Sequence, residues 1–345
     1  MTRKINRRAF VAMTAAVPAL PTMGALAQDN ATPAPATGDQ PPLDTLRIRH
    51  PKTLAFAAPF LLVDPDGPLS AFAETVDIAE YPSPDALRPM LVNGDSEVTA
   101  VPSYVGANLA NRGVDVKLAA VVVWGLLWVL GPEGTAPDWE SLRGQTIMCP
   151  YRNDMPDLVF RHLATSNGLN PDEDFTIEYY AQPPEVVARL VGGEGVWAVM
   201  PEHTATLALN QARQNGREIG RILDLQQEWG AVTGSEPRIP QAGIVVPGSL
   251  AEEQPELVGA VLDELERAVG LVNAAAPETV AMLAEGSGVP EPVVRDVIPR
   301  LNLDVVPADQ AQEELERFYT ELATLSEDII GGGLPDPDFY LPDPR

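Results

Sequence analysis

Short apolar runs alternate with amphipathic segments along most of the chain. Apolar runs of four to eight residues predict strands, and apolar positions three or four residues apart predict helices. In the first part of the chain the pattern predicts strands at 45–49, 76–81 and 97–101, and helices at 54–62, 83–94 and 104–111. Strands that alternate with helices favour βα units in an α/β fold with parallel strands.

The same pattern indicates two lobes joined by two crossovers. The apolar runs 117–123 and 126–130 are separated by Trp124-Gly125, where we expect the first crossing. The strand 243–246 lies between Pro240 and Pro247 and predicts the return, after which the chain is predicted to be helical to about residue 330. Between the crossings the pattern predicts strands at 145–149, 175–180 and 196–200 and helices at 157–166, 184–190 and 204–215.

We therefore expect lobe one at 44–127 and 243–345 and lobe two at 128–242, with hinge strands near 126–130 and 241–246. Strand carboxyl ends and helix amino ends from both lobes then face a cleft, which is where open α/β sheets bind ligands.

The first 27 residues are typical of an export signal. Four cations at positions 3, 4, 7 and 8 precede a small apolar run, and Ala25-Leu26-Ala27 forms an A-x-A cleavage site. The pair Arg7-Arg8 is similar to a twin-arginine signal, and general secretory export is the alternative. The Ala- and Pro-rich segment 28–43 is predicted to be a disordered tether. We expect the mature protein to be periplasmic.

Composition excludes several classes of partner. The formal net charge of −26 argues against nucleic acid and anionic membrane surfaces as partners. No apolar run after the leader is long enough for a membrane helix. The single Cys149 allows no intramolecular disulfide. We expect a monomer whose stability comes from packing.

Polar and aromatic residues follow the predicted strands, where a cleft would hold a small solute. Tyrosine and tryptophan suit a planar or amphipathic solute, because each has an apolar face and one polar group. The candidate ligand-binding residues are His50, Tyr104 and Trp124 from lobe one, and Tyr151, Arg152, Asn153, Tyr180, Glu202 and His203 from lobe two.

Two of these candidates favour opposite solutes. Arg152 suits a carboxylate, sulfonate or phosphate, unless it pairs with Asp154 or Asp157 in its own loop. Glu202 suits an amine or a heterocyclic N–H, unless it only caps the helix that follows.

A metal or haem site is an alternative. Soft ligands lie near neighbouring strand ends, at Met148, Cys149, Met155, Met200 and His203. Their spacing matches no known metal signature, so we expect no metal and no cofactor. The chain also lacks a G-x-S-x-G elbow, an H-E-x-x-H motif and a glycine-rich phosphate loop, and we expect no enzymatic activity.

Several phrases of the sequence resemble periplasmic solute-binding proteins of the nitrate, sulfonate and taurine type, which share an architecture with pyrimidine-precursor binding proteins. The segment 138–147 resembles that family's "D-L-x-G-K-x-I" phrase, and 167–171 its "G-L-D-P" turn. Further similar segments are 82–94, 184–193, 201–202, 247–258 and 334–340.

The resemblance implies a type II periplasmic binding fold and the function of a substrate-binding component of an ABC importer. The expected partners are a small solute, whether a sulfonate, nitrate or a heterocyclic or aromatic compound, and the membrane permease. A binding protein that presents its ligand to a sensory receptor is a further alternative, because one fold serves both tasks.

Overall fold

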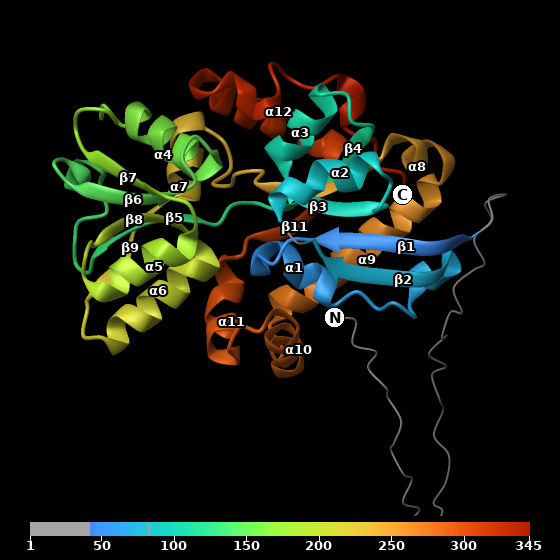
Figure 1. Cartoon of the computed structure of the whole chain (residues 1–345), viewed down its shortest axis with the longest axis horizontal. Helices are drawn as coiled ribbons and strands as arrows, with labels where there is room; N and C mark the ends of the chain where they lie inside the picture. The colour runs from blue at the N-terminus through green and yellow to red at the C-terminus, as the bar shows by residue number, and fades with distance from the viewer. Residues whose placement is uncertain (1–41, 82) are drawn as a thin grey trace, which may run out of the picture. The chain divides into compact units, whose positions relative to one another are not determined.

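The computed structural model describes residues 42–81 and 83–345, and its helices and strands are labelled in Figure 1. The predicted export signal and all but the last two residues of the predicted tether lie outside the described residues. The first strand begins at Leu43.

Six strands form the first sheet, in the order β11-β4-β10-β3-β1-β2. Strand β1 pairs in parallel with β2 and β3, whereas β10 is antiparallel to β3 and β4, and β11 is antiparallel to β4. The strands are β1 (Leu43–His50), β2 (Ala73–Glu80), β3 (Val98–Pro102), β4 (Val116–Val123), β10 (Ala242–Pro247) and β11 (Leu303–Pro307).

Five strands form the second sheet, in the order β7-β6-β8-β5-β9. Strand β6 pairs in parallel with β7 and β8, and β5 is antiparallel to β8 and β9. The strands are β5 (Leu127–Pro132), β6 (Thr146–Pro150), β7 (Thr176–Tyr180), β8 (Trp197–Pro201) and β9 (Ile219–Asp224).

The helices connect these strands and cover the sheets. Proline in the first turn starts several of them, and glycine in the left-handed conformation ends α5 at Gly193 and α7 at Gly234. The α-helices are α1 (Leu54–Leu61), α2 (Leu87–Val92), α3 (Ser103–Asn111), α4 (Met155–Ser166), α5 (Pro183–Gly192), α6 (Glu202–Gln214), α7 (Leu225–Thr233), α8 (Gly248–Glu253), α9 (Pro255–Ala274), α10 (Pro277–Ser287), α11 (Glu291–Val297) and α12 (Ala308–Leu325).

The predicted α/β class is confirmed, with three corrections in detail. Each sheet is mixed rather than parallel throughout, because β4 and β5, on either side of the first crossing, pair antiparallel with strands of their own sheets. The strand β9 and helix α7 had not been predicted. The expected helical region after 246 contains the strand β11.

The first crossover, Trp124 to Leu126, has its backbone held by side chains. Leu126 N–H donates to Gln241 Oε1 at 3.0 Å, and Gly125 O accepts from Asn302 Nδ2 at 2.8 Å. Gly125 has φ of 111°, and a Cβ there would lie 2.3 Å from Gln226 Cγ. Only glycine therefore fits this crossover without strain.

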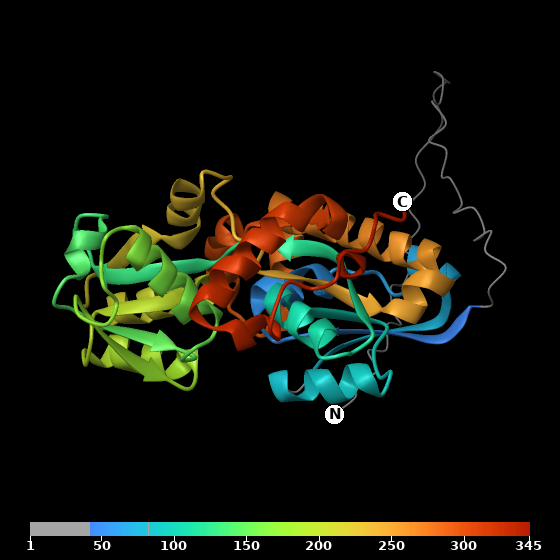
Figure 2. The ribbon, with the colours of Figure 1, turned by 90° about the horizontal axis from the view of Figure 1, so that it is seen from above.

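Helix α12 links the two sheets (Figure 2). It contacts β4 and β11 of the first sheet and α4, which flanks the second. Phe318 on α12 packs edge-on against Trp229 of α7 with ring centroids 5.7 Å apart. One apolar cluster accordingly contains Val121 of the first sheet and Val129 of the second. The predicted lobe boundaries stay a prediction, and the two sheets share part of their core.

Candidate functional site

Two side chains lie at the carboxyl ends of the parallel strands β1 and β2. His50 ends β1, with its Nδ1 3.0 Å from the carbonyl oxygen of Pro51 and its ring stacked on Phe60. Because a carbonyl only accepts, Nδ1 carries the proton and Nε2 keeps its lone pair. Burial lowers the pKa of His50, so the imidazole is neutral near pH 7. Tyr81 follows β2, and burial raises the pKa of its hydroxyl.

The loop between β6 and α4 has an unusual backbone conformation. The angle φ is 62° at Tyr151 and 57° at Asn153, in the left-handed region that side chains disfavour. Tyr151 N–H donates to the carbonyl oxygen of Tyr180 at 3.0 Å, and its hydroxyl donates to Gln182 Oε1 at 3.1 Å. Strain of about 1–3 kcal/mol per residue persists only where the surroundings fix the chain, and it is concentrated at functional sites. This loop therefore has a defined shape.

A hydrogen bond between Tyr104 and Asp154 joins the helix that follows β3 of the first sheet to the loop that follows β6 of the second sheet. Tyr104 lies in the first turn of α3, directly after β3, and its hydroxyl donates to Asp154 Oδ1 at 2.5 Å. Burial raises the pKa of Tyr104 well above its usual value, and the negative charge of Asp154 adds to that shift. The phenol therefore stays protonated and serves as a donor. The same carboxylate oxygen accepts from Met155 N–H at 2.8 Å.

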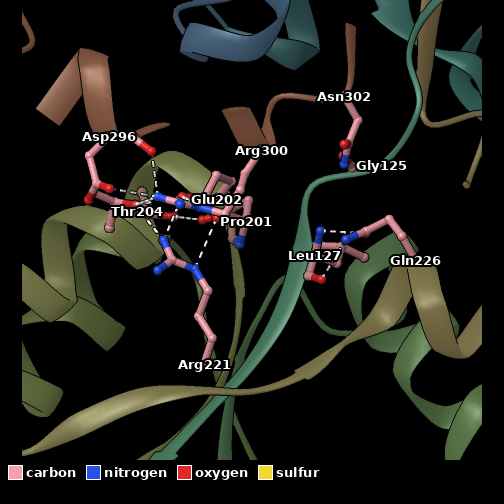
Figure 3. Close-up of polar contacts among 11 residues, drawn as sticks. Gly125, Leu127, Pro201, Glu202, Thr204, Arg221, Gln226, Asp296, Arg300 and Asn302 are labelled. Carbon is pink, nitrogen blue, oxygen red and sulfur yellow. Dashed lines mark hydrogen bonds and ion pairs between the residues drawn. The ribbon is translucent and has the colours of Figure 1, made fainter. Parts of the chain in front are cut away.

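Glu202 lies at the end of β8 and is wholly buried. Arg221 Nη2 donates to Oε1 at 2.6 Å and Nε to Oε2 at 3.1 Å, while Arg300 Nε donates to Oε1 at 2.9 Å (Figure 3). Thr206 Oγ1 adds a bond at 2.5 Å. Both carboxylate oxygens are thus engaged by protein groups, and we leave Glu202 out of the site proposed below.

Trp124 lies in the first crossover and is 2% exposed. Its Nε1 donates to the carbonyl oxygen of Asp304 at 3.1 Å, and the Arg238 guanidinium lies 4.0 Å from its ring centroid. This indole is part of the first crossover, and its one donor is already bound.

Arg152 is exposed, and its guanidinium lies 5.2 Å from the centroid of the Tyr179 ring. The expected alternative pairing is wrong: within 42–81 and 83–345 no ion pair joins Arg152 to Asp154 or Asp157. The second carboxylate instead pairs with Arg161 at 3.0 Å. The sequence suggested only carboxylates near Arg152 in the loop as its partners, and it did not reveal that Arg161, one turn further along α4, pairs with Asp157.

Tyr180 is the last residue of β7, and His203 lies in the first turn of α6. The Tyr180 hydroxyl donates to Glu178 Oε2 at 3.0 Å, and Arg189 lies over its ring. His203 Nδ1 is buried and has no hydrogen-bond partner among the described residues. Burial lowers the pKa of His203 to about 4, so this imidazole is neutral.

The five candidate soft ligands are not brought together. Met148 and Met200 pack into one apolar cluster, and Cys149 and Met155 belong to another. Successive residues of a strand point to opposite faces of its sheet, which separates Met148 from Cys149. No group of three or more histidine, cysteine, aspartate or glutamate side chains suited to a metal occurs in the described part of the chain.

Reasoning from sequence missed Tyr81, Asp154, Gln182 and Arg300 as parts of these clusters. Tyr81 follows β2, so the rule that selected His50 would also have selected it. Asp154 had been considered only as a partner of Arg152. Arg300 is 98 residues from Glu202, and no local pattern predicts that contact.

A surface hollow of about 590 Å³ lies elsewhere on the first sheet's side of the molecule. Its walls include Leu43, Val92, Asp115 and Leu250. These residues lie near the start of β1 and the end of β10, which is antiparallel to β3. Tyr81 and Tyr104 instead lie at the carboxyl ends of β2 and β3, and Asp154 follows the carboxyl end of β6. We therefore do not assign the hollow to the solute.

No family model matches the chain, and no curated protein matches it. Solved structures do match. The periplasmic aliphatic sulphonate binding protein SsuA from Escherichia coli superposes with a TM-score of 0.70 and 15% identity, covering 88% of this chain and 93% of that one. An ABC transporter protein from Parabacteroides distasonis gives 0.71 and 19%, covering 86% and 98%. The periplasmic nitrate-binding protein NrtA from Synechocystis PCC 6803 gives 0.61 and 13%, covering 84% of each.

The fold is the type II periplasmic binding fold. This agrees with the two mixed sheets and the two crossovers, and it confirms the fold expected from the sequence resemblance. Within the described residues, no helix is both long and apolar enough to cross a membrane.

Proposed function

We propose that this protein is the periplasmic solute-binding component of an ABC importer and captures a small solute between its two lobes. The observation that carries the proposal is the bond from Tyr104 to Asp154, because it joins strand-end residues of the two sheets. In open α/β sheets, ligands bind beyond the carboxyl ends of the strands. Solved proteins with this fold include binders of sulphonate and nitrate.

The proposed site is built around His50, Tyr81, Tyr104, Tyr151 and Asp154. The three tyrosine hydroxyls are neutral donors and acceptors, and their rings supply flat apolar faces. Asp154 Oδ2 receives no hydrogen bond from any described residue, which leaves an acceptor for a solute donor. Arg152 and Asn153 stay candidates at the exposed edge of the same loop.

This set favours a planar solute with an N–H or ammonium donor over a small anion. A carboxylate at the site repels an anion, and Arg221 and Arg300 are engaged by Glu202. Of the solutes that the resemblance implies, a heterocyclic or aromatic compound therefore fits better than nitrate or a sulfonate. We expect no catalysis, in keeping with the matched proteins, which include an ABC transporter protein and a sulphonate binding protein.

Lobe closure is the proposed mechanism. A solute that contacts both lobes binds one arrangement better than others, and it shifts the population toward the arrangement that a permease recognises. A ligand-presenting protein for a sensory receptor would use the same closure, and the identity of the membrane partner separates the two. Copurification of this protein with an ABC permease, rather than with a sensory receptor, would support the importer.

The experiment is calorimetric titration of the released solute into refolded, solute-free protein. The variants are Asp154→Asn and Tyr104→Phe, and the matched control is Tyr179→Phe, whose hydroxyl bonds to Arg161 and Asp157 instead. The proposal expects at least tenfold weaker binding in the first two and unchanged binding in the control. Unchanged affinity in both site variants would contradict the proposed site.

A further inference from the structure

Arg300 connects the two sheets next to the first crossover. It ends the short helix η4 (Ile298–Arg300), which is followed within three residues by β11 of the first sheet. Its Nε donates to Glu202 Oε1 at 2.9 Å, and its Nη2 lies 3.4 Å from Thr206 Oγ1, both on α6 behind the second sheet. The same guanidinium donates to the carbonyl oxygen of Asp296 at 2.5 Å, which anchors it on α11 (Figure 3).

Glu202 and Asn302, which lies two residues after Arg300, are each bonded to the crossover itself. Glu202 N–H donates to the carbonyl oxygen of Leu126 at 2.7 Å. On the other side, Asn302 Nδ2 donates to Gly125 O at 2.8 Å, and its own carbonyl accepts from Trp124 N–H at 2.9 Å. Backbone groups of the crossover are thus bonded to Glu202 and to the segment that carries Arg300.

Glu202 needs one cation for its charge and has two. Arg221 comes from β9, in the same sheet as the β8 strand that precedes Glu202, and its fork contacts both carboxylate oxygens. That pair is internal to the second lobe and persists in any rigid movement of it. The Arg300 contact exists only while the segment before β11 stays against α6.

A contact made in one arrangement and lost in others favours that arrangement by its own free energy. The carboxylate is wholly buried and the Arg300 side chain is 26% exposed, so water screens this pair less than a surface pair.

We propose that Arg300 is a clamp on this hinge: its ion pair with Glu202 holds the lobes in the arrangement described here, and its loss increases the population of other arrangements. The proposal rests on the proposed function, since lobe movement is how that function uses a hinge. Among the described residues, Arg300 has no hydrogen bond or ion pair to a residue of the proposed solute site, so it acts through the lobe equilibrium and is a positioning residue.

The test measures lobe separation in solute-free protein. Spin labels are placed on Asp66→Cys, in the loop after α1, and on Glu185→Cys of α5, both exposed positions, while the buried Cys149 is kept. Distance distributions are recorded by pulsed electron paramagnetic resonance for the parent, for Arg300→Gln and for the control Arg221→Gln. Thermal unfolding of each protein shows whether it is folded.

The clamp predicts that Arg300→Gln increases at least threefold the population at distances other than the parent's main one, whereas Arg221→Gln lowers thermal stability and leaves the distribution unchanged. Arg300→Lys, which keeps the charge and loses the fork, should give a smaller shift in the same direction. This second variant serves if Arg300→Gln does not fold.

An unchanged distribution in folded Arg300→Gln, or in Arg300→Lys where only that variant folds, would overturn the clamp. An equal shift in Arg221→Gln would overturn it too, since the effect would then belong to Glu202 as a whole. Because no solute is present, these failures leave solute capture untouched, and the absence of a solute in native protein would leave the clamp untouched.

Discussion

The hydroxyl of Tyr104 donates a 2.5 Å hydrogen bond to Asp154, across the boundary between the two sheets. Tyr104 lies in the first turn of the helix after β3, and Asp154 is the N-cap of the helix after β6. Bonds to charged acceptors are short and strong, and each contributes about 1.5–3 kcal/mol. A solute that enters between the lobes must accommodate or replace this bond.

Tyr104→Phe keeps the ring and removes that donor. We expect solute affinity to fall about tenfold to a hundredfold, which is the range that about 1.5–3 kcal/mol implies. The unfolding free energy should fall by a similar amount or less, because Asp154 keeps its bond from Met155 N–H. Calorimetric titration and urea denaturation measure the two effects. A stable variant with parental affinity would remove Tyr104 from the site.

Gly125→Ala tests the crossover. Alanine at φ of 111° is strained, and its Cβ would lie 2.3 Å from Gln226 Cγ. Gly134→Ala is the matched control, with φ of 84° and no heavy atom within 4 Å of the added Cβ. We expect the control to cost about 1–2 kcal/mol in unfolding free energy and Gly125→Ala to cost more. Equal losses by urea denaturation would show that contact with Gln226 is unimportant.

Glu202→Gln leaves two arginine side chains beside a neutral, buried amide. Removing one partner of a buried ion pair typically costs about 3–5 kcal/mol, so we expect a large loss of unfolding free energy. Glu140→Gln is the control, because Glu140 pairs with Arg143 at the exposed surface, where ion pairs contribute little to stability. Thermal unfolding of the parent and of both variants measures the two losses of stability. A loss in Glu202→Gln as small as in the control would contradict the buried network.

His203 should make the protein less stable in mild acid. Its pKa is about 4 in the folded protein, against 6.5 for the free side chain, so the unfolded chain binds the proton more readily. Stability from the neutral imidazole is therefore full above pH 6.5 and is lost as the pH falls toward 4, by up to about 3 kcal/mol. His50 and His162, whose pKa values are also lowered, act in the same direction.

His203→Gln should flatten the dependence of the unfolding free energy on pH between about 6.5 and 4. The measurement is urea denaturation at pH 7.5, 5.5 and 4.5 in the parent and the variant. A variant with the same slope as the parent would show that His203 does not titrate as its burial requires.

Much of the fold followed from local pattern. The strand expected at 45–49 is β1 at 43–50, and the helix expected at 157–166 is α4 at 155–166, because apolar period and capping residues are local signals. The strand β9 was missed since Gly220, Arg221 and Asp224 interrupt its apolar run. The strand β11, with Asp304 and Pro307 in five residues, has too short an apolar run to predict a strand by itself.

The site was predictable only in part. Strand-end position selected Tyr104 and Tyr151, which do lie near one another. It also selected Glu202, whose partner Arg300 is remote in sequence, and nothing local indicates that its oxygens are engaged. Tertiary packing decides which strand-end residues form bonds between the two sheets. Local patterns in a single sequence do not show this packing.

The most direct test of the account is to identify what the native protein carries. Protein purified from the periplasm of its own host is analysed by native mass spectrometry, and the released solute and metal content are measured. We predict one equivalent of a small planar organic compound with an N–H or ammonium group, and no stoichiometric metal. Stoichiometric copper or iron, or a bound nitrate or sulfonate, would contradict the proposed site.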